Sequence, residues 1–235
     1  MSKLELNSQG AIIVRIEQVN LTGGETPYQI LYISDLHLGW RRSSRIVANL
    51  IAIAQTEQPD LILLGGDLVD RRAGLSILTQ AVRELADLAP VWAIPGNHDC
   101  WVGVELVDRA ILVGGGRWLE GKSVTFPLKS VSVRVDGCLA PIQAVDVELK
   151  ILCAHNPIAF EQAQSYQLVL AGHLHGCQWV FWQQDNRLYP GAWFYRWNGL
   201  RFQRENTTLI VSRGVGDTLP IRWNCPREVI LCQVF

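Results

Sequence analysis

The chain lacks several features that are typical of membrane, secreted and nucleic-acid-binding proteins. It has 235 residues, of which 21 are Lys or Arg and 22 are Asp or Glu, so it has no excess of positive charge to attract a nucleic-acid backbone. Residues 1–10 are polar, and the apolar run that follows covers only residues 11–14. Such a run is too short for a secretory signal or a membrane span. We therefore expect a cytoplasmic location.

Paired cysteines and charged residues are also scarce. The six cysteines are scattered, and no two of them form a C-x-x-C motif. In a cytoplasmic chain of this size we expect buried thiols, and neither a disulfide framework nor a thiolate zinc site. Charged residues make up 18% of the chain and hydrophobic residues 49%. This composition allows a sizeable core and excludes extended disorder.

The first hundred residues alternate between short apolar runs and amphipathic segments. We predict strands over 29–34, 61–64 and 91–94, and helices over 45–57 and 75–88. Asp35, Asp67 and Asn97 follow the three strands, and successive members of this set are 32 and 30 residues apart. Each interval fits one βαβ unit. Because right-handed crossovers bring the ends of parallel strands to one edge of a sheet, we expect the three polar side chains to converge.

From about residue 114 the pattern changes to short strand-like segments without clear helices. This half of the chain predicts a second, more antiparallel sheet. Strands are expected at 122–127, 130–135, 148–154 and 168–171, and the tail supplies strand candidates at 199–204, 207–212 and 228–234. No linker, low-complexity tract or repeat is visible, so we expect one α/β domain over residues 1–235.

All five histidines lie within a few residues of the end of an apolar run. A single histidine in such a place is more often structural than metal-binding, but five beside Asp35 and Asp67 are hard to attribute to packing. Imidazole, carboxylate and amide ligands together suit Mn, Fe, Zn or Co better than Ca or Mg. Seven such side chains are too many for one metal and fit two metals that share a carboxylate. They are Asp35, His37, Asp67, Asn97, His155, His173 and His175.

Together, these motifs resemble those of the calcineurin-like metallophosphoesterases. The matching series is Asp35-x-His37, Gly66-Asp67, Gly96-Asn97-His98-Asp99, His155 and Gly172-His173-x-His175, in the order and approximate spacing of that family. The resemblance implies a four-layer α/β/β/α sandwich of two mixed β-sheets flanked by helices. It also implies a dinuclear metal centre that hydrolyses a phosphodiester, pyrophosphate or phosphomonoester bond by attack of a metal-bound hydroxide.

The resemblance further implies a role for each motif residue. The ligands would form two sets around a shared carboxylate: Asp35, His37 and His175 for the first metal, Asn97, His155 and His173 for the second, and Asp67 as the bridge. His98 would protonate or stabilise the leaving oxygen, and Asp99 would hydrogen-bond the His98 ring and orient it. The cofactors would be two divalent transition-metal ions, with manganese as the first expectation and Fe, Zn, Ni and Co as alternatives.

A narrower similarity lies near the C-terminus. Residues 211–216 (VSRGVG) and 220–229 (PIRWNCPREV) resemble a block of bacterial phosphoesterases of the YkuE type. Some of these relatives cleave the pyrophosphate of UDP-2,3-diacylglucosamine, so a lipid-linked or nucleotide substrate is one expectation. The alternatives are a general phosphomonoesterase, a cyclic-nucleotide or nucleic-acid phosphodiesterase and, in another class, a non-catalytic metal-binding scaffold.

Two further groups of residues are candidates for substrate contacts. Arg41, Arg42 and Arg71 follow the first two ligand loops, where their guanidinium groups either bind phosphate or face solvent. Aromatic residues cluster within 179–197. They form either the core and rim of a sheet or an apolar surface for an acyl chain or a peripheral membrane contact.

Overall fold

The apolar runs of the first hundred residues form the centre of a mainly parallel sheet. In the computed structural model, which describes residues 4–6, 10–21, 26–128, 131–138 and 149–235, the central strands pair in parallel as the βαβ spacing predicts. The sheet has the order β2-β16-β3-β4-β5-β6. Its strands are β2 (Ile13–Val19), β16 (Glu228–Val234), β3 (Tyr28–Ile33), β4 (Leu61–Gly65), β5 (Val91–Ile94) and β6 (Arg117–Trp118).

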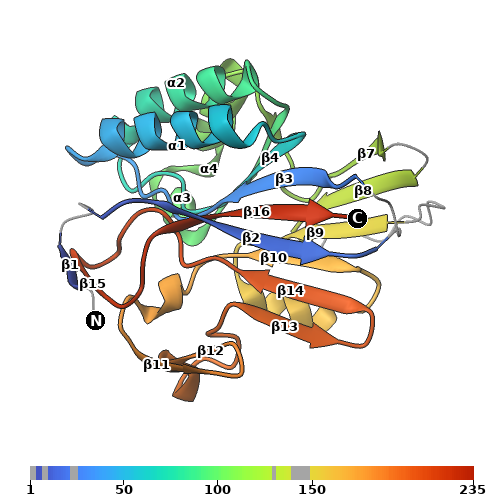
Figure 1. Cartoon of the computed structure of the whole chain (residues 1–235). Coiled ribbons are helices and arrows are strands. Elements are labelled where there is room, and N and C mark those ends of the chain that lie inside the picture. The colour runs from blue at the N-terminus through green and yellow to red at the C-terminus, as the bar shows by residue number, and fades with distance from the viewer. Residues whose placement is uncertain (1–3, 7–9, 22–25, 129–130, 139–148) are drawn as a thin grey trace.

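Helices cover one face of this sheet (Figure 1). They are α1 (Ser43–Glu57), α2 (Leu75–Ala86), α3 (Asn97–Val102) and α4 (Val104–Val113). Leu50 of α1 and Leu78 of α2 are buried in one cluster with Leu64 of β4, and each such side chain contributes about 1.5–3 kcal/mol by leaving water. Gly103 has a φ of +117° and separates α3 from α4, a conformation that favours glycine.

A second six-stranded sheet packs against the other face of the first. Its order is β13-β14-β10-β9-β8-β7. The two sheets share a buried core in which Tyr32 and Leu63 of the first sheet meet Ile151 and Leu170 of the second. The strands are β13 (Arg201–Arg204), β14 (Thr207–Val211), β10 (Leu168–Ala171), β9 (Leu149–Cys153), β8 (Val131–Gly137) and β7 (Ser123–Leu128).

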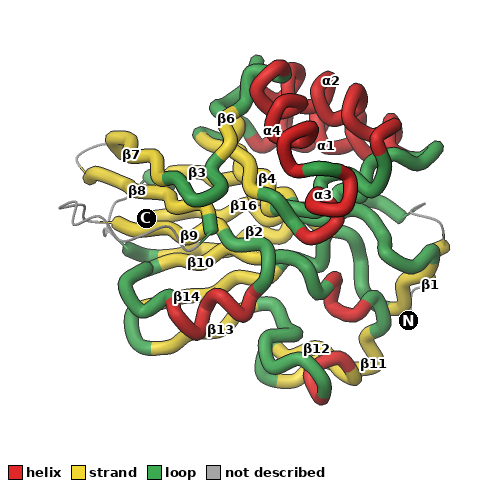
Figure 2. The backbone as a smooth tube through the Cα atoms, turned by 180° about the vertical axis from the view of Figure 1, so that it is seen from behind, coloured by secondary structure: helices red, strands yellow, loops and turns green. Residues whose placement is uncertain are grey.

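The predicted α/β fold with two mixed sheets flanked by helices is confirmed, but its fourth layer is thin. The outer face of the second sheet is covered by the 3-10 helix η2 (Pro157–Gln162), whose Phe160 is fully buried there. Only 14 residues, 154–167, connect β9 to β10. This connection is too short for a long helix and its two turns. Figure 2 shows the resulting asymmetry, with the α-helices gathered on one side of the stacked sheets.

Two small antiparallel sheets lie outside the sandwich and were not predicted. β1 (Leu4–Leu6) pairs with β15 (Ile221–Trp223), and β11 (Val180–Gln184) pairs with β12 (Arg187–Pro190). The β11–β12 hairpin projects on the side opposite the helices (Figure 2). Short 3-10 turns complete the described structure: η1 (Arg72–Gly74), η3 (His175–Cys177) and η4 (Gly191–Trp193).

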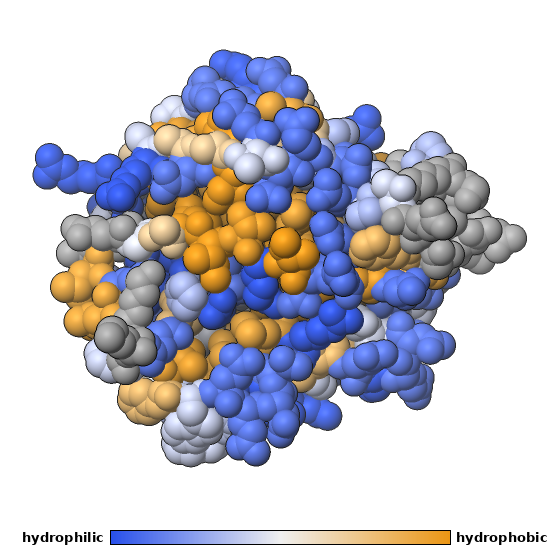
Figure 3. Space-filling view, in the orientation of Figure 1, coloured by the Kyte–Doolittle hydropathy of each residue, from blue (hydrophilic) through white to orange (hydrophobic). Residues whose placement is uncertain are grey.

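Hydrophobic residues also reach the surface along the edge of the first sheet. Figure 3 shows them gathered between α1 and the edge strand β2, where Ile13 and Ile16 are exposed. No helix in the described part of the chain is long and apolar enough to cross a membrane. The six cysteines are free thiols, but only Cys153, Cys225 and Cys232 are buried. That residues 1–235 form a single domain stays a prediction.

Candidate metal centre

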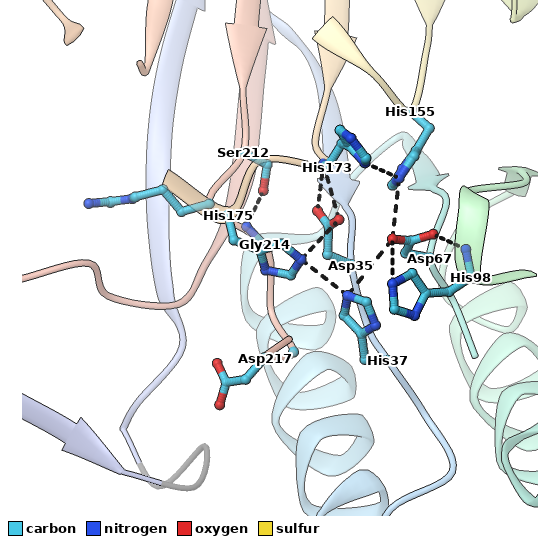
Figure 4. A network of polar contacts seen from close by, with 12 residues as sticks. Asp35, His37, Asp67, His98, His155, His173, His175, Ser212, Gly214 and Asp217 are labelled. Atoms are coloured by element: carbon cyan, nitrogen blue, oxygen red, sulfur yellow. Dashed lines mark hydrogen bonds and ion pairs between the residues drawn. The ribbon is translucent and has the colours of Figure 1, made fainter. Parts of the chain in front are cut away.

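The first cluster of candidate ligands lies where β3 and β10 end. It consists of Asp35, His37 and His175, and all three side chains are buried. His175 Nε2 lies 3.1 Å from His37 Nε2 and 3.4 Å from Asp35 Oδ1. Figure 4 shows the two imidazole rings and the carboxylate pointing toward one another. One cation could therefore contact all three side chains.

The second cluster lies where β4, β5, β9 and β10 end. His155 Nε2 lies 3.1 Å from His173 Nδ1, 3.3 Å from Asp67 Oδ2 and 3.1 Å from Asn97 Oδ1. The other nitrogen of His155, Nδ1, lies 2.9 Å from the Gly65 carbonyl oxygen. This contact ties the second sheet to the first and orients the His155 ring.

Asp67 lies between the two clusters (Figure 4). Besides its contact with His155, its Oδ2 lies 3.9 Å from His37 Nε2. Its other oxygen, Oδ1, accepts a hydrogen bond of 2.8 Å from the His98 backbone N–H. The position of Asp67 allows one carboxylate to serve both clusters, as the sequence predicts for a bridging ligand.

The spacing of these atoms fits metal binding. Ligand atoms that each lie about 2.0–2.2 Å from one transition metal are about 3.0–3.5 Å from one another. The two histidine pairs, His37 with His175 and His155 with His173, have ring nitrogens 3.1 Å apart. Each pair has a carboxylate oxygen at 3.3–3.4 Å. The donor set therefore fits two divalent ions.

The backbone of the candidate ligands is strained. Five of the seven predicted ligands have φ between 48° and 72°, in the left-handed region. Non-glycine residues adopt this conformation at a cost of about 1–3 kcal/mol each, and such strain concentrates at functional sites. The five are Asp35, His37, Asp67, His173 and His175. The surrounding strands and loops hold these residues in a geometry that local propensity disfavours.

Within each cluster the surroundings raise the pKa of one histidine and lower that of the other: His37 and His155 are raised, and His175 and His173 are lowered. Burial alone would lower the pKa of His155, but the hydrogen bond and charge of Asp67, together with the charge of Asp35, raise this pKa to about 9. At His175, burial and the charges of His37 and Arg222 hold the pKa well below its usual range. His175 is thus kept neutral, which is the form that binds a metal.

The prediction that Asp99 hydrogen-bonds the His98 ring is wrong. The Asp99 carboxylate is fully buried and accepts hydrogen bonds of 2.8–3.1 Å from the backbone N–H groups of Leu68, Val69 and Gly96. The cause is that α3 begins directly at Asn97, so Asp99 lies in its first turn. There its side chain turns back to the N-terminal end of the helix. Asp99 holds the ligand loops together instead.

Asp70 contacts the His98 ring, a role that the sequence did not indicate. Its Oδ1 lies 2.9 Å from His98 Nδ1 and 2.6 Å from His37 Nδ1, and its Oδ2 accepts a hydrogen bond of 2.7 Å from Trp40 Nε1. Burial would raise the pKa of Asp70, but the hydrogen bond and charge of His37 lower it to about 2. Asp70 therefore stays ionised and orients both rings. The sequence signal that could have indicated this role is the position of Asp70, three residues after Asp67.

The three arginines predicted to contact substrate have separate surroundings. Arg42 Nη2 donates a hydrogen bond of 3.1 Å to the Asp217 carbonyl oxygen. The Arg71 guanidinium lies 3.5 Å from the centre of the Trp40 ring, and Trp40 connects it to Asp70. Arg41 is exposed. Phosphate binding by these arginines stays a prediction.

Known proteins match this chain in sequence and in fold. The family model of calcineurin-like phosphoesterases matches residues 28–212. Phosphodiesterase YaeI of Escherichia coli K12 is 29% identical over 230 residues, which cover 88% of this chain and 82% of the relative. An uncharacterized metallophosphoesterase of Aquifex aeolicus is 29% identical over 236 residues, with coverage of 93% and 89%.

Solved structures show the same fold at lower identity. The protein TT1561 of Thermus thermophilus has a TM-score of 0.51 at 14% identity, covering 81% of this chain and 91% of that one. Phosphopantetheinyl hydrolase from Mycobacterium tuberculosis also has a TM-score of 0.51, at 11% identity, with coverage of 85% and 96%. The ligand clusters at the strand ends agree with the family match over most of the chain. The chain belongs to the calcineurin-like phosphoesterase family, which uses a dinuclear divalent metal centre, and it is a metal-dependent phosphoesterase.

Proposed function

We propose that the chain hydrolyses a phosphodiester or pyrophosphate bond at two divalent ions held by the two clusters. Asp35, His37 and His175 hold the first ion, Asn97, His155 and His173 hold the second, and Asp67 bridges them. The supporting observation is the pair of histidine contacts at 3.1 Å, each beside a buried carboxylate. When bound, such a pair of ions binds phosphate oxygens and lowers the pKa of the attacking water.

In this proposal His98 acts on the leaving group. Its Nδ1 is held by Asp70, which leaves Nε2 on the side of the centre, 4.0 Å from Asp67 Oδ2. The His98 side chain is 19% exposed, so a substrate can reach it. An imidazole in this position can donate a proton to the departing oxygen. Asp70 keeps the ring oriented through its contact with Nδ1.

The finer details of the proposal concern the metal, the substrate and the location. Manganese is the first expected metal, since nitrogen and carboxylate ligands suit it and affinity alone does not select the metal. The C-terminal block supports a relation to phosphoesterases of the YkuE type, and with it a lipid-linked or nucleotide substrate such as UDP-2,3-diacylglucosamine. The name of the Escherichia coli relative favours diester hydrolysis over monoester hydrolysis. A cytoplasmic location and a peripheral membrane contact stay predictions.

A substrate panel with Mn²⁺ tests the proposed function. It compares UDP-2,3-diacylglucosamine, a cyclic dinucleotide, bis-p-nitrophenyl phosphate and p-nitrophenyl phosphate. We expect turnover of at least one diester or pyrophosphate substrate to exceed that of the monoester at least about tenfold, and chelation to abolish it. If the purified protein binds no divalent ion, or if it hydrolyses none of the four compounds in the presence of Mn²⁺, the proposal is wrong. Preferred turnover of the monoester would favour the alternative of a general phosphomonoesterase.

Replacing His98 by Asn is expected to separate metal binding from catalysis. The variant should retain both ions because His98 belongs to neither ligand set, while kcat falls by about 10²–10⁴, the usual contribution of a general acid. Metal analysis and steady-state kinetics on the best panel substrate measure the two effects. In the related variant Asp70→Asn, kcat should also fall, because the His98 ring loses the carboxylate that orients it. Metal analysis of this variant is needed too, because Asp70 also contacts the proposed ligand His37. Loss of metal from His98→Asn would contradict the assigned role.

Metal affinity is expected to increase between pH 7 and pH 9. The pKa of His155 in the metal-free protein is about 9, so at pH 7 this ring carries a proton that a metal must displace. The affinity for Mn²⁺ should therefore rise by up to about tenfold per pH unit over this range and level off above it. Calorimetric titration in buffers of different ionisation enthalpy would detect the released proton. An affinity that is constant from pH 7 to pH 9 would contradict the role of His155.

A further inference from the structure

A hollow of about 250 Å³ lies directly beside the second ligand cluster. It is situated between η2 and residues 194–197, and His173 forms part of its wall. The remaining wall is mostly apolar and includes Pro157, Ile158 and Leu174. His173 belongs to the proposed ligand set. A substrate with its phosphate at the metal centre could therefore place a neighbouring group in this hollow through a short linker.

One side of the hollow is firmly anchored. Trp197 packs edge-on against Phe160 and Phe202, with ring centroids 5.0 and 5.2 Å apart. Its Nε1 donates a hydrogen bond of 3.3 Å to Glu161, which also accepts one of 3.4 Å from Arg196 Nη1. These contacts connect residues 196–197 to η2. The hollow is therefore a built feature of the fold.

The lip of the hollow consists of aromatic side chains that the fold does not bury. Phe194 is 77% exposed and Tyr195 is 52% exposed, although both follow η4 immediately and line the hollow. Exposed apolar side chains at the mouth of a hollow indicate a ligand surface more often than a structural need. The two rings contribute little to the core, and their faces are accessible to another molecule.

We propose that this hollow binds a planar ring system carried by the phosphate substrate, of which a nucleobase is the principal biological example. Aromatic side chains bind flat rings by stacking, whatever the identity of the ring. Asn156, Glu161 and Arg196 also line the hollow and offer polar groups to the edges of such a ring. This mixture of aromatic and polar groups suits a nucleobase better than an acyl chain, which has no polar edge to match.

The size of the hollow supports the same ligand class. Pockets for whole drug-sized ligands measure about 300–1,000 Å³, and this hollow is somewhat smaller at about 250 Å³. It can hold one ring system while the sugar and phosphate extend past His173. The proposal deepens the proposed function and rests on it for the position of the phosphate.

Binding of phosphonates tests the proposal without requiring turnover, because their P–C bond is not a phosphoester. The probes are 9-(2-phosphonomethoxyethyl)adenine, the matched (2-methoxyethoxy)methylphosphonate without the base, and octylphosphonate. Calorimetry with Mn²⁺-loaded protein should show that the adenine compound binds about tenfold more tightly than the base-free compound. In the double variant Phe194→Ala/Tyr195→Ala this ratio should fall to about one, with the affinity for inorganic phosphate unchanged. The control Phe181→Ala removes an exposed ring of β11 and should keep the ratio.

Each outcome separates the proposal from its alternatives. Equal binding of the adenine and base-free compounds, or a ratio that survives the double variant, overturns it. Preferential binding of octylphosphonate that depends on Phe194 and Tyr195 also overturns it, and assigns the hollow to an acyl chain. If the adenine preference holds but no substrate of the panel is hydrolysed, the ring site stands and the proposed function fails.

Discussion

Replacing Asp67 by asparagine is expected to remove most of the bound metal and to lower kcat/KM by at least about 10³-fold. The Asp67 carboxylate lies 3.3 Å from His155 Nε2 and 3.9 Å from His37 Nε2, between the two clusters. An amide carries no charge to offset two divalent ions, and its NH₂ group cannot act as a ligand. A loss of about 4 kcal/mol of charge stabilisation at the centre corresponds to this factor.

The Asp67→Asn experiment requires metal analysis as well as kinetics. Protein purified from Mn²⁺-supplemented cells should contain about two ions per chain before substitution and fewer than one afterwards. Asp87→Asn is the matched control, because Asp87 is exposed at the end of α2, before β5, and the ligand Asn97 follows the other end of that strand. A variant that keeps both ions and stays within tenfold of the original activity would remove Asp67 from the bridging position.

The convergence of Asp35, Asp67 and Asn97 could be predicted because it follows from chain topology alone. Parallel strands with helical crossovers end at one edge of a sheet, and β3, β4 and β5 do so. The histidines could be assigned to the same region because each follows a strand. No side-chain geometry was required for these steps, since the backbone direction determines where each loop lies.

The partner of His98 could not be predicted, because it depends on side-chain direction. Asp70 and Asp99 are both carboxylates close to the ligand motifs. Asp99 is adjacent to His98 in sequence, yet it lies in the first turn of α3 and binds backbone N–H groups. Asp70 is 28 residues away from His98 and reaches its ring. A pattern of residue types cannot show which of the two carboxylates contacts the His98 ring. The structure shows it, because the first turn of α3 directs Asp99 toward backbone N–H groups.

The exposed aromatic residues illustrate a second limit. Trp, Tyr and Phe in a strand pattern are typical of a buried sheet, and the partial burial of Trp197 against the second sheet agrees with that interpretation. Phe181, Trp193 and Phe194 are instead 58–77% exposed. They lie on or beside β11–β12, a separate two-stranded sheet that lies outside the two stacked sheets (Figure 2). Composition does not reveal whether a second layer will cover a strand.

Replacing Arg222 by methionine is expected to reduce the free energy of unfolding by about 3–5 kcal/mol, the usual cost of removing one partner of a buried ion pair. Arg222 is fully buried. Its Nε lies 2.7 Å from Asp217 Oδ1, and its Nη groups donate hydrogen bonds of 2.6 and 2.9 Å to the carbonyl oxygens of Gly216 and Arg213. Methionine is apolar and satisfies none of these acceptors.

The same substitution should weaken the first ligand cluster. Arg222 Nη2 lies 3.3 Å from His175 Nδ1, so the guanidinium both positions this ring and disfavours its protonation. Urea denaturation of metal-free protein measures the stability, and metal titration measures the cluster. Arg196→Met is the control, because the Arg196–Glu161 pair is mostly exposed and its loss should cost at most about 1 kcal/mol.

Asp217 determines how the Arg222→Met result is interpreted. It also pairs with Arg227 Nη2 at 2.6 Å, and Arg227 pairs with Glu5 Oε2 at 2.9 Å, so part of its charge stays compensated when Arg222 is removed. If the free energy of unfolding of the variant lies within about 1 kcal/mol of that of the original protein, Arg227 alone is sufficient to stabilise Asp217. If the variant keeps its stability but binds metal more weakly, the main role of Arg222 is to position His175. A parallel loss of both would show that one buried network supports the fold and the metal centre together.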